Sequence, residues 1–213
     1  AMSRIRTILV CALLSATLAA AQDRRTGLVS KGWELEFEFE DPRRLSVNIP
    51  GEAEARTYWY LPFRVINRSG QEVDFLPSFR LVTDTLEVRE GGENVHPHVS
   101  DLIAARHRQT LPFLEPPFRI TGKLLQAREH ARSPAMDFEP FDPQADSAST
   151  YVSGLSGELE RVPNLAFDAN KPASDDNPRW FLLRRTLEIK YDFPGDEQTR
   201  STPVRRNRQW VLR

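Results

Sequence analysis

The feature that most constrains the fold is a strict alternation of apolar and acidic residues after residue 32. The apolar residues Trp33, Leu35, Phe37 and Phe39 occupy every second position and alternate with four glutamates. Because successive side chains of a strand point to opposite faces, this segment predicts a half-buried strand of an antiparallel sheet. The turn signal Asp41-Pro42 precedes a second alternation. We therefore expect a hairpin over residues 33–49.

Similar patterns recur along the chain. Residues 57–67 are apolar at both odd and even positions, which predicts a strand covered on both faces, with Pro62 at an edge or a bulge. A turn at Asn67–Gly70 should lead to a return strand beginning at Val73. Odd positions from Phe181 to Phe193 predict a long strand, and residues 204–212 predict the closing strand.

Other segments complete the expected fold. Residues 100–109 predict a short helix capped by Ser100. Residues 120–125 predict a further strand, and the proline-rich segments 127–149 and 163–178 predict long loops. Eight to ten strands separated by turn signals predict a mainly β fold. We expect an antiparallel β-sandwich with one short helix and long loops.

The first 21 residues have the pattern of a secretory signal peptide. Two arginines precede an apolar run from Ile8 to Ala20, which is too short to cross a bilayer as a helix. Small residues at Ala19–Ala21 suit a signal peptidase. We expect cleavage after Ala21, a single domain over residues 22–213, and export to a periplasm or to the extracellular medium. An uncleaved membrane anchor is the alternative.

Composition excludes several classes of chemistry. Cys11, the one cysteine, lies in the signal segment, so the remaining 192 residues (213 minus 21) hold no disulfide, thiol nucleophile or thiolate metal site. Those residues carry 27 basic and 30 acidic side chains, a charge of −3, which argues against nucleic acid as a partner. No later apolar stretch is long enough to cross a membrane. With neither a phosphate loop nor a dinucleotide fingerprint, we expect no cofactor.

One residue pair suggests a metal site. His96 and His98 lie two apart, so on a strand both rings would point the same way and could reach one metal ion. An exposed loop beside Pro97 is the alternative interpretation.

Two regions suggest binding surfaces. The first is the aromatic run Tyr58, Trp59 and Tyr60. The second is the basic C-terminal region, where residues 179–213 contain nine basic and four acidic residues, a local charge of +5. Its clustered arginines are Arg205, Arg206 and Arg208. Pairing with acidic residues of the same domain is the alternative.

Arg185 interrupts the apolar face of the long strand. An inward arginine needs a partner, because an unpaired buried charge is costly. An anionic ligand, an internal acid, or a bulge that turns the side chain outward would each satisfy it.

Three stretches resemble a group of uncharacterised secreted bacterial proteins. They are Tyr58-Trp59-Tyr60 with the turn that follows, Tyr151–Gly157, and Leu183–Asp196. Their hairpin pattern is similar to immunoglobulin-like sandwiches. The resemblance implies an immunoglobulin-like fold class and no activity.

The predicted function is an exported, non-catalytic binding or scaffolding domain that acts in the cell envelope. Its partner would be another envelope protein or a polysaccharide, and the oligomeric state is open. One alternative is a periplasmic metal-binding protein that uses His96 and His98. Another is a carbohydrate-active enzyme, which would carry two carboxylates beside a cleft.

Overall fold

The structure is a computed structural model that describes residues 27–30, 32–111, 114–115, 119–195 and 202–213. Over these residues the chain is mainly β, with antiparallel sheets and one α-helix, as the alternating patterns predict. The predicted signal peptide lies outside the described residues and stays a prediction, as does the finer assignment to an immunoglobulin-like topology. Within the described part, no helix is long and apolar enough to cross a membrane.

The largest sheet has seven strands. In spatial order they are β1 (Gly27–Ser30), β11 (Leu159–Pro163), β12 (Trp180–Asp192), β10 (Ser147–Ser153), β6 (Ser78–Thr83) and β7 (Val88–Glu90), with β13 (Val204–Leu212) also paired to β12. The predicted long strand and closing strand are both confirmed as β12 and β13.

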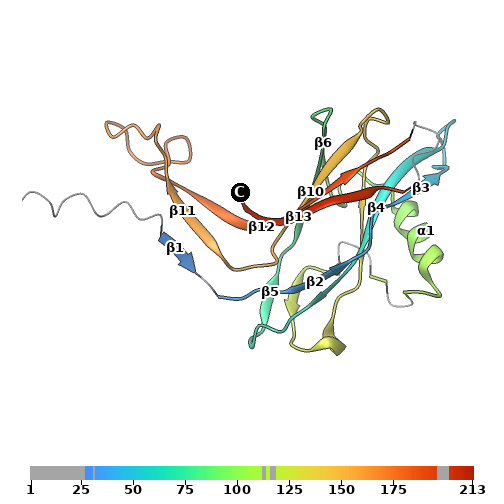
Figure 1. Ribbon diagram of the computed structural model, residues 1–213, viewed down its shortest axis with the longest axis horizontal. Coiled ribbons are helices and arrows are strands. Elements are labelled where there is room, and N and C mark those ends of the chain that lie inside the picture. The colour runs from blue at the N-terminus through green and yellow to red at the C-terminus, as the bar shows by residue number, and fades with distance from the viewer. Residues whose placement is uncertain (1–26, 31, 112–113, 116–118, 196–201) are drawn as a thin grey trace, which may run out of the picture.

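Strand β12 is long enough to serve two successive partners. Its residues 187–192 pair with β10, whereas its residues 180–184 pair with β11. Strand β13 pairs only with residues 185–192. As a result, residues 180–184 and β11 form a hairpin that projects away from the part of the molecule that carries the helix (Figure 1).

The second sheet is built around β4 (Arg56–Ile66). Its other strands are β2 (Glu36–Phe39), β3 (Arg43–Val47) and β9 (Ala135–Phe138). The predicted 33–49 hairpin is wrong, because β2 and β3 pair with successive stretches of β4 and not with each other. Period two reports which face a residue occupies, and it carries no information about the neighbouring strand.

Pro62 lies in β4 between the stretch that pairs with β2 and the stretch that pairs with β3. A proline cannot donate a ladder hydrogen bond, so this break is where its missing N–H costs least. The carbonyl of Pro62 still accepts a hydrogen bond from the Glu40 amide at 3.0 Å. The expected edge position or bulge at Pro62 is therefore not what the structure has; β4 is paired on both sides, and Pro62 lies at the break between β2 and β3.

Two short strands form a small third sheet, β5 (Val73–Phe75) with β8 (Gly122–Leu124). The turn at Asn67–Gly70 is confirmed. Gly70 has a φ of 87°, and the side-chain Oδ1 of Asn67 accepts a hydrogen bond from the backbone N–H of Ser69. The return strand, however, pairs with β8 and not with β4. Strand β9 and the 3-10 turn Arg128–His130 lie inside the predicted loop 127–149, which is therefore only partly irregular.

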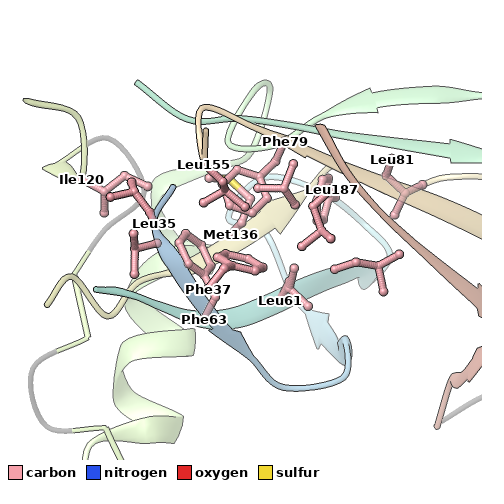
Figure 2. Close-up of a cluster of buried hydrophobic side chains, with 14 of the residues drawn as sticks. Leu35, Phe37, Leu61, Phe63, Phe79, Leu81, Ile120, Met136, Leu155 and Leu187 are labelled. Atoms are coloured by element: carbon pink, nitrogen blue, oxygen red, sulfur yellow. The ribbon is translucent and has the colours of Figure 1, made fainter. Parts of the chain in front are cut away.

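The two larger sheets share one apolar core. Side chains from β2 and β4 meet side chains from β6, β10 and β12 between the sheets (Figure 2). The fully buried members include Leu61, Val65, Val152, Leu187 and Ile189. Each sheet therefore turns its apolar face toward the other.

The opposite face of β4 packs against helix α1 (Pro97–His107). This second core contains Tyr58, Tyr60, Val99 and Ile103. Strand β4 is thus covered on both faces, as its two-sided apolar pattern predicts. The helix begins three residues before the predicted start, and its N-cap is His96 and not Ser100.

Candidate functional site

The hairpin that projects from the large sheet, residues 159–184, is here named the arm. It consists of β11, an irregular loop over 164–179 and the first part of β12. Residues that lie directly opposite in its ladder are Arg161 with Leu182 and Pro163 with Trp180. The predicted long loop after Val162 is this connection, which begins just after the end of β11.

Within the described part of the chain, the arm carries large apolar side chains that are exposed to solvent. Leu165 is 96% exposed, Leu182 59%, Phe181 47% and Trp180 45%. Since neighbours along a strand point to opposite faces, Trp180 and Leu182 lie on one face and Phe181 lies on the other. Clustered apolar exposure of this kind is typical of an interaction site, whereas single exposed apolar residues are ordinary.

Side-chain amides hold the loop of the arm in a defined shape. The Asn164 amide donates to the carbonyl of Pro178 at 2.7 Å. The side-chain amide of Asn177 donates to the backbone carbonyl of Asp168 at 3.0 Å. The backbone N–H of Asp168 donates in return to the side-chain oxygen of Asn177 at 2.9 Å. These bonds tie the two ends of the loop together and support the hairpin tip.

Arg185 anchors the base of the arm. Its Nη1 lies 2.8 Å from a carboxylate oxygen of Glu34 and 3.0 Å from one of Glu158. Its guanidinium also lies 4.5 Å from the centre of the Trp210 ring. Of the three possibilities that the sequence leaves open, internal acids are therefore the partners of Arg185.

Four arginines on or beside the arm form no ion pair with any described residue; they are Arg161, Arg179, Arg184 and Arg213. Three of them lie over aromatic rings instead. Arg161 is 4.2 Å from the centre of the Trp180 ring, Arg179 is 5.1 Å from Phe167 and Arg213 is 3.9 Å from Tyr151. Stacked guanidinium groups keep N–H donors at their edges, which suits binding to anionic groups.

The register brings part of this chemistry onto one surface. Leu159, Arg161 and Pro163 of β11 lie opposite Arg184, Leu182 and Trp180 of β12, and directly opposed residues share a face. We call this set of six residues the arm face. The sequence pattern does not reveal this surface, because the odd-numbered apolar residues of β12 predict one covered face. The available signal was the polar loop 164–179, which offers few apolar residues to cover the strand beside it.

The predicted aromatic surface at Tyr58, Trp59 and Tyr60 is wrong, because these side chains are 1%, 8% and 0% exposed. Both faces of β4 are covered, so aromatic density there contributes to two cores. Trp59 borders one pocket of about 220 Å³, which is also lined by Phe141 and Phe193.

The C-terminal arginines are exposed but hold partners within the chain. Arg205 lies 3.9 Å from Asp41, and Arg206 pairs with Asp192. The guanidinium groups of Arg205 and Arg208 lie 5.2 and 5.4 Å from the centre of the Phe39 ring. Arg205 and Arg206 therefore pair with acids of the same domain, as the alternative interpretation predicts, whereas the contact of Arg208 is with the Phe39 ring.

The two histidines lie at the start of α1 and not on a strand. His96 is the N-cap, and its Nδ1 accepts a hydrogen bond from the His98 amide at 3.2 Å. The ring centres are 6.5 Å apart at an interplanar angle of 82°. Among the described residues, no group of three or more His, Cys, Asp or Glu side chains could hold a metal ion.

A cleft of about 640 Å³ lies between α1, the turn after β7 and β9. Four acidic residues line it, namely Glu93, Asp101, Glu115 and Asp137. Glu115 pairs with Arg132 at 2.8 Å, and Asp137 accepts from the Ser100 hydroxyl at 2.7 Å. Burial raises the pKa of the Asp137 carboxyl, and the bond from Ser100 ties α1 to β9.

A second buried polar pair lies at the other end of α1. The Tyr60 hydroxyl lies 3.0 Å from Nε2 of His107, whose side chain is almost wholly buried. Burial lowers the pKa of His107, and the nearby Arg43 acts in the same direction. Burial raises the pKa of Tyr60, so both groups are neutral near pH 7. The pair serves as an internal hydrogen-bonded support for α1.

Comparisons with known proteins add no assignment to this geometry. No family model matches the chain, and no curated protein or solved structure matches it significantly.

Proposed function

We propose that this protein is an exported, non-catalytic binding domain that docks on another macromolecule of the cell envelope through its arm. The observation that carries the proposal is the arm itself. It places Trp180 and Leu182 in solvent beside arginines that no described acidic residue neutralises. An apolar centre with flanking arginines is the composition of an interaction hot spot.

The contrast with three other arginines of β12 and β13 supports the choice of the arm. Arg185, Arg205 and Arg206 each lie beside a carboxylate of the same chain. Their charges are already compensated and their positions explained by packing. No described carboxylate lies beside the arginines of the arm in this way, which leaves their charges available to a partner.

Site-specific photo-cross-linking in the native envelope tests the proposal. A photo-reactive amino acid is placed at Leu182 on the arm and, as a matched control, at Leu86, which is 84% exposed in the turn between β6 and β7. Both positions are apolar and exposed, and they differ in their surroundings. We expect a discrete cross-linked product from position 182 alone, detected with an antibody to the protein. Equal labelling at both positions, or none at 182, would contradict the proposal.

The two alternative functions stay predictions. A periplasmic metal-binding protein would use His96 and His98, which the helix cap holds with one ring nitrogen engaged by the backbone. A carbohydrate-active enzyme would use the acidic cleft, where Glu115 and Asp137 already have partners within the chain. Among the described residues, the arm combines exposed apolar side chains with arginines that form no ion pair, and for this reason we favour the binding function.

A further inference from the structure

We propose that the partner of the arm is a protein, and that it binds as an extended acidic segment which adds a strand to the open edge of β12. This inference rests on the proposed binding function and specifies the chemistry of the partner. Three features of the arm carry it: an unpaired backbone edge, a row of uncompensated arginines and an exposed apolar centre.

The backbone edge follows from the hydrogen bonds at the end of β13. Arg184 and Arg213 exchange two backbone hydrogen bonds, of 2.7 and 3.1 Å. Backbone groups alternate between the two edges of a strand, so Leu182 and Trp180 point their N–H and C=O groups to the same edge as Arg184. No described strand lies opposite Leu182 and Trp180 on that edge. Such an edge is a template for another extended chain.

The side chains around this edge define what kind of strand would fit. Arg184 and Arg213 lie at one end of the open stretch, and Arg161 lies across the ladder from Leu182. An added strand would place alternate side chains on the arm face, beside Leu182. Carboxylates at those positions would meet guanidinium groups that have no acidic partner among the described residues, while the apolar centre would be covered.

The edge also distinguishes a protein partner from other anionic macromolecules. A polysaccharide or a lipid surface would need only the arginines and could ignore the backbone groups of β12. A polypeptide strand uses the main-chain donors and acceptors for affinity and the side chains for specificity. The combination of open edge and arginines on one short stretch therefore favours a protein segment.

The test uses a synthetic peptide of alternating glutamate with valine or threonine as its probe. Binding to the purified protein is measured by fluorescence anisotropy at low and at high salt. We expect saturable binding that weakens at high salt, because the arginines are solvent-exposed. A peptide of the same charge with a central proline should bind about tenfold more weakly, since the proline removes a backbone N–H donor from the ladder.

A pair of variants at one position separates the backbone edge from the side chain. The Leu182 N–H points away from β11, so Leu182→Pro removes an edge donor without removing a bond of the β11–β12 ladder. We expect Leu182→Pro to weaken peptide binding about tenfold and Leu182→Ala only about twofold. Arg184→Gln provides an independent variant on the charge. It should weaken binding and reduce its dependence on salt. Circular dichroism and urea midpoints verify that each variant is folded.

Two further probes can overturn strand addition while leaving the proposed binding function intact. They are polygalacturonate and vesicles that contain phosphatidylglycerol. If either binds the arm while the acidic peptide does not, or if the proline peptide binds as well as the parent peptide, strand addition is overturned. A cross-link from position 182 in the native envelope would then still support the binding function. Absence of that cross-link, in contrast, would contradict both the binding function and the strand-addition inference.

Discussion

Both halves of β12 are rich in apolar residues, but they differ in burial. In the C-terminal half, Leu187 and Ile189 are wholly buried between the sheets. In the N-terminal half, Phe181 and Leu182 are about half exposed on the arm. Apolar residues occur in both halves, although Arg185 interrupts the odd-numbered apolar face and Leu182 lies on the opposite face from Leu187. A period of two therefore marks the faces of a strand, and only the surrounding elements decide whether a face is covered.

The clearest way to test this comparison is to truncate one leucine in each half. Leu187→Ala should lower the free energy of unfolding by about 2–5 kcal/mol, because it leaves a cavity in a packed core. Leu182→Ala should change it by less than about 0.5 kcal/mol, because that side chain already contacts water. Urea denaturation monitored by tryptophan fluorescence measures both. Similar losses for the two variants would mean that the arm is packed in solution.

A smaller effect is expected at the junction of the two halves. Arg185→Ala removes the contacts with Glu34 and Glu158 and the stacking on Trp210. The side chain is about a quarter exposed, so we expect a loss of only about 1 kcal/mol. Amide hydrogen exchange in β11 should accelerate more than exchange in β10, because the anchor holds the arm. Arg206→Ala, at an exposed pair, is the control and should change neither quantity measurably.

The smallest effect concerns pH and belongs to the covered side of the molecule. Burial lowers the pKa of His107, so the folded state resists a proton that the unfolded state takes up below about pH 6.5. Stability is therefore complete above that pH and falls as the pH decreases toward the lower folded pKa, by at most about 1.4 kcal/mol per pH unit. His107→Gln should reduce this slope in urea titrations between pH 7 and pH 5. The slope should stay unchanged in Leu182→Ala, which alters only the arm.

The candidate site was only partly predictable from the sequence. The C-terminal arginines and Arg185 are recognisable as unusual, yet Arg185, Arg205 and Arg206 find carboxylates within the chain. The carboxylate partner of Arg185 closest to it, Glu34, is 151 positions away in the sequence (185 minus 34), so no local pattern reports it. The aromatic run at Tyr58 was interpreted as a binding surface, because a strand covered on both faces and an exposed interaction surface have the same composition. The helix start was missed because His96, which is not among the preferred cap residues, caps it.

Several properties were determined by the sequence alone. Period-two alternation predicted the mainly β class and the position of β12, and the two-sided apolar run of residues 57–67 predicted β4, because side-chain direction along a strand is a local property. Tertiary structure alone decided which strands pair, which apolar face is covered and which arginine meets an acid. These outcomes depend on contacts between residues far apart in the chain. The exposed arm, with its open edge and uncompensated arginines, exists only because β12 extends beyond the elements that cover its other half.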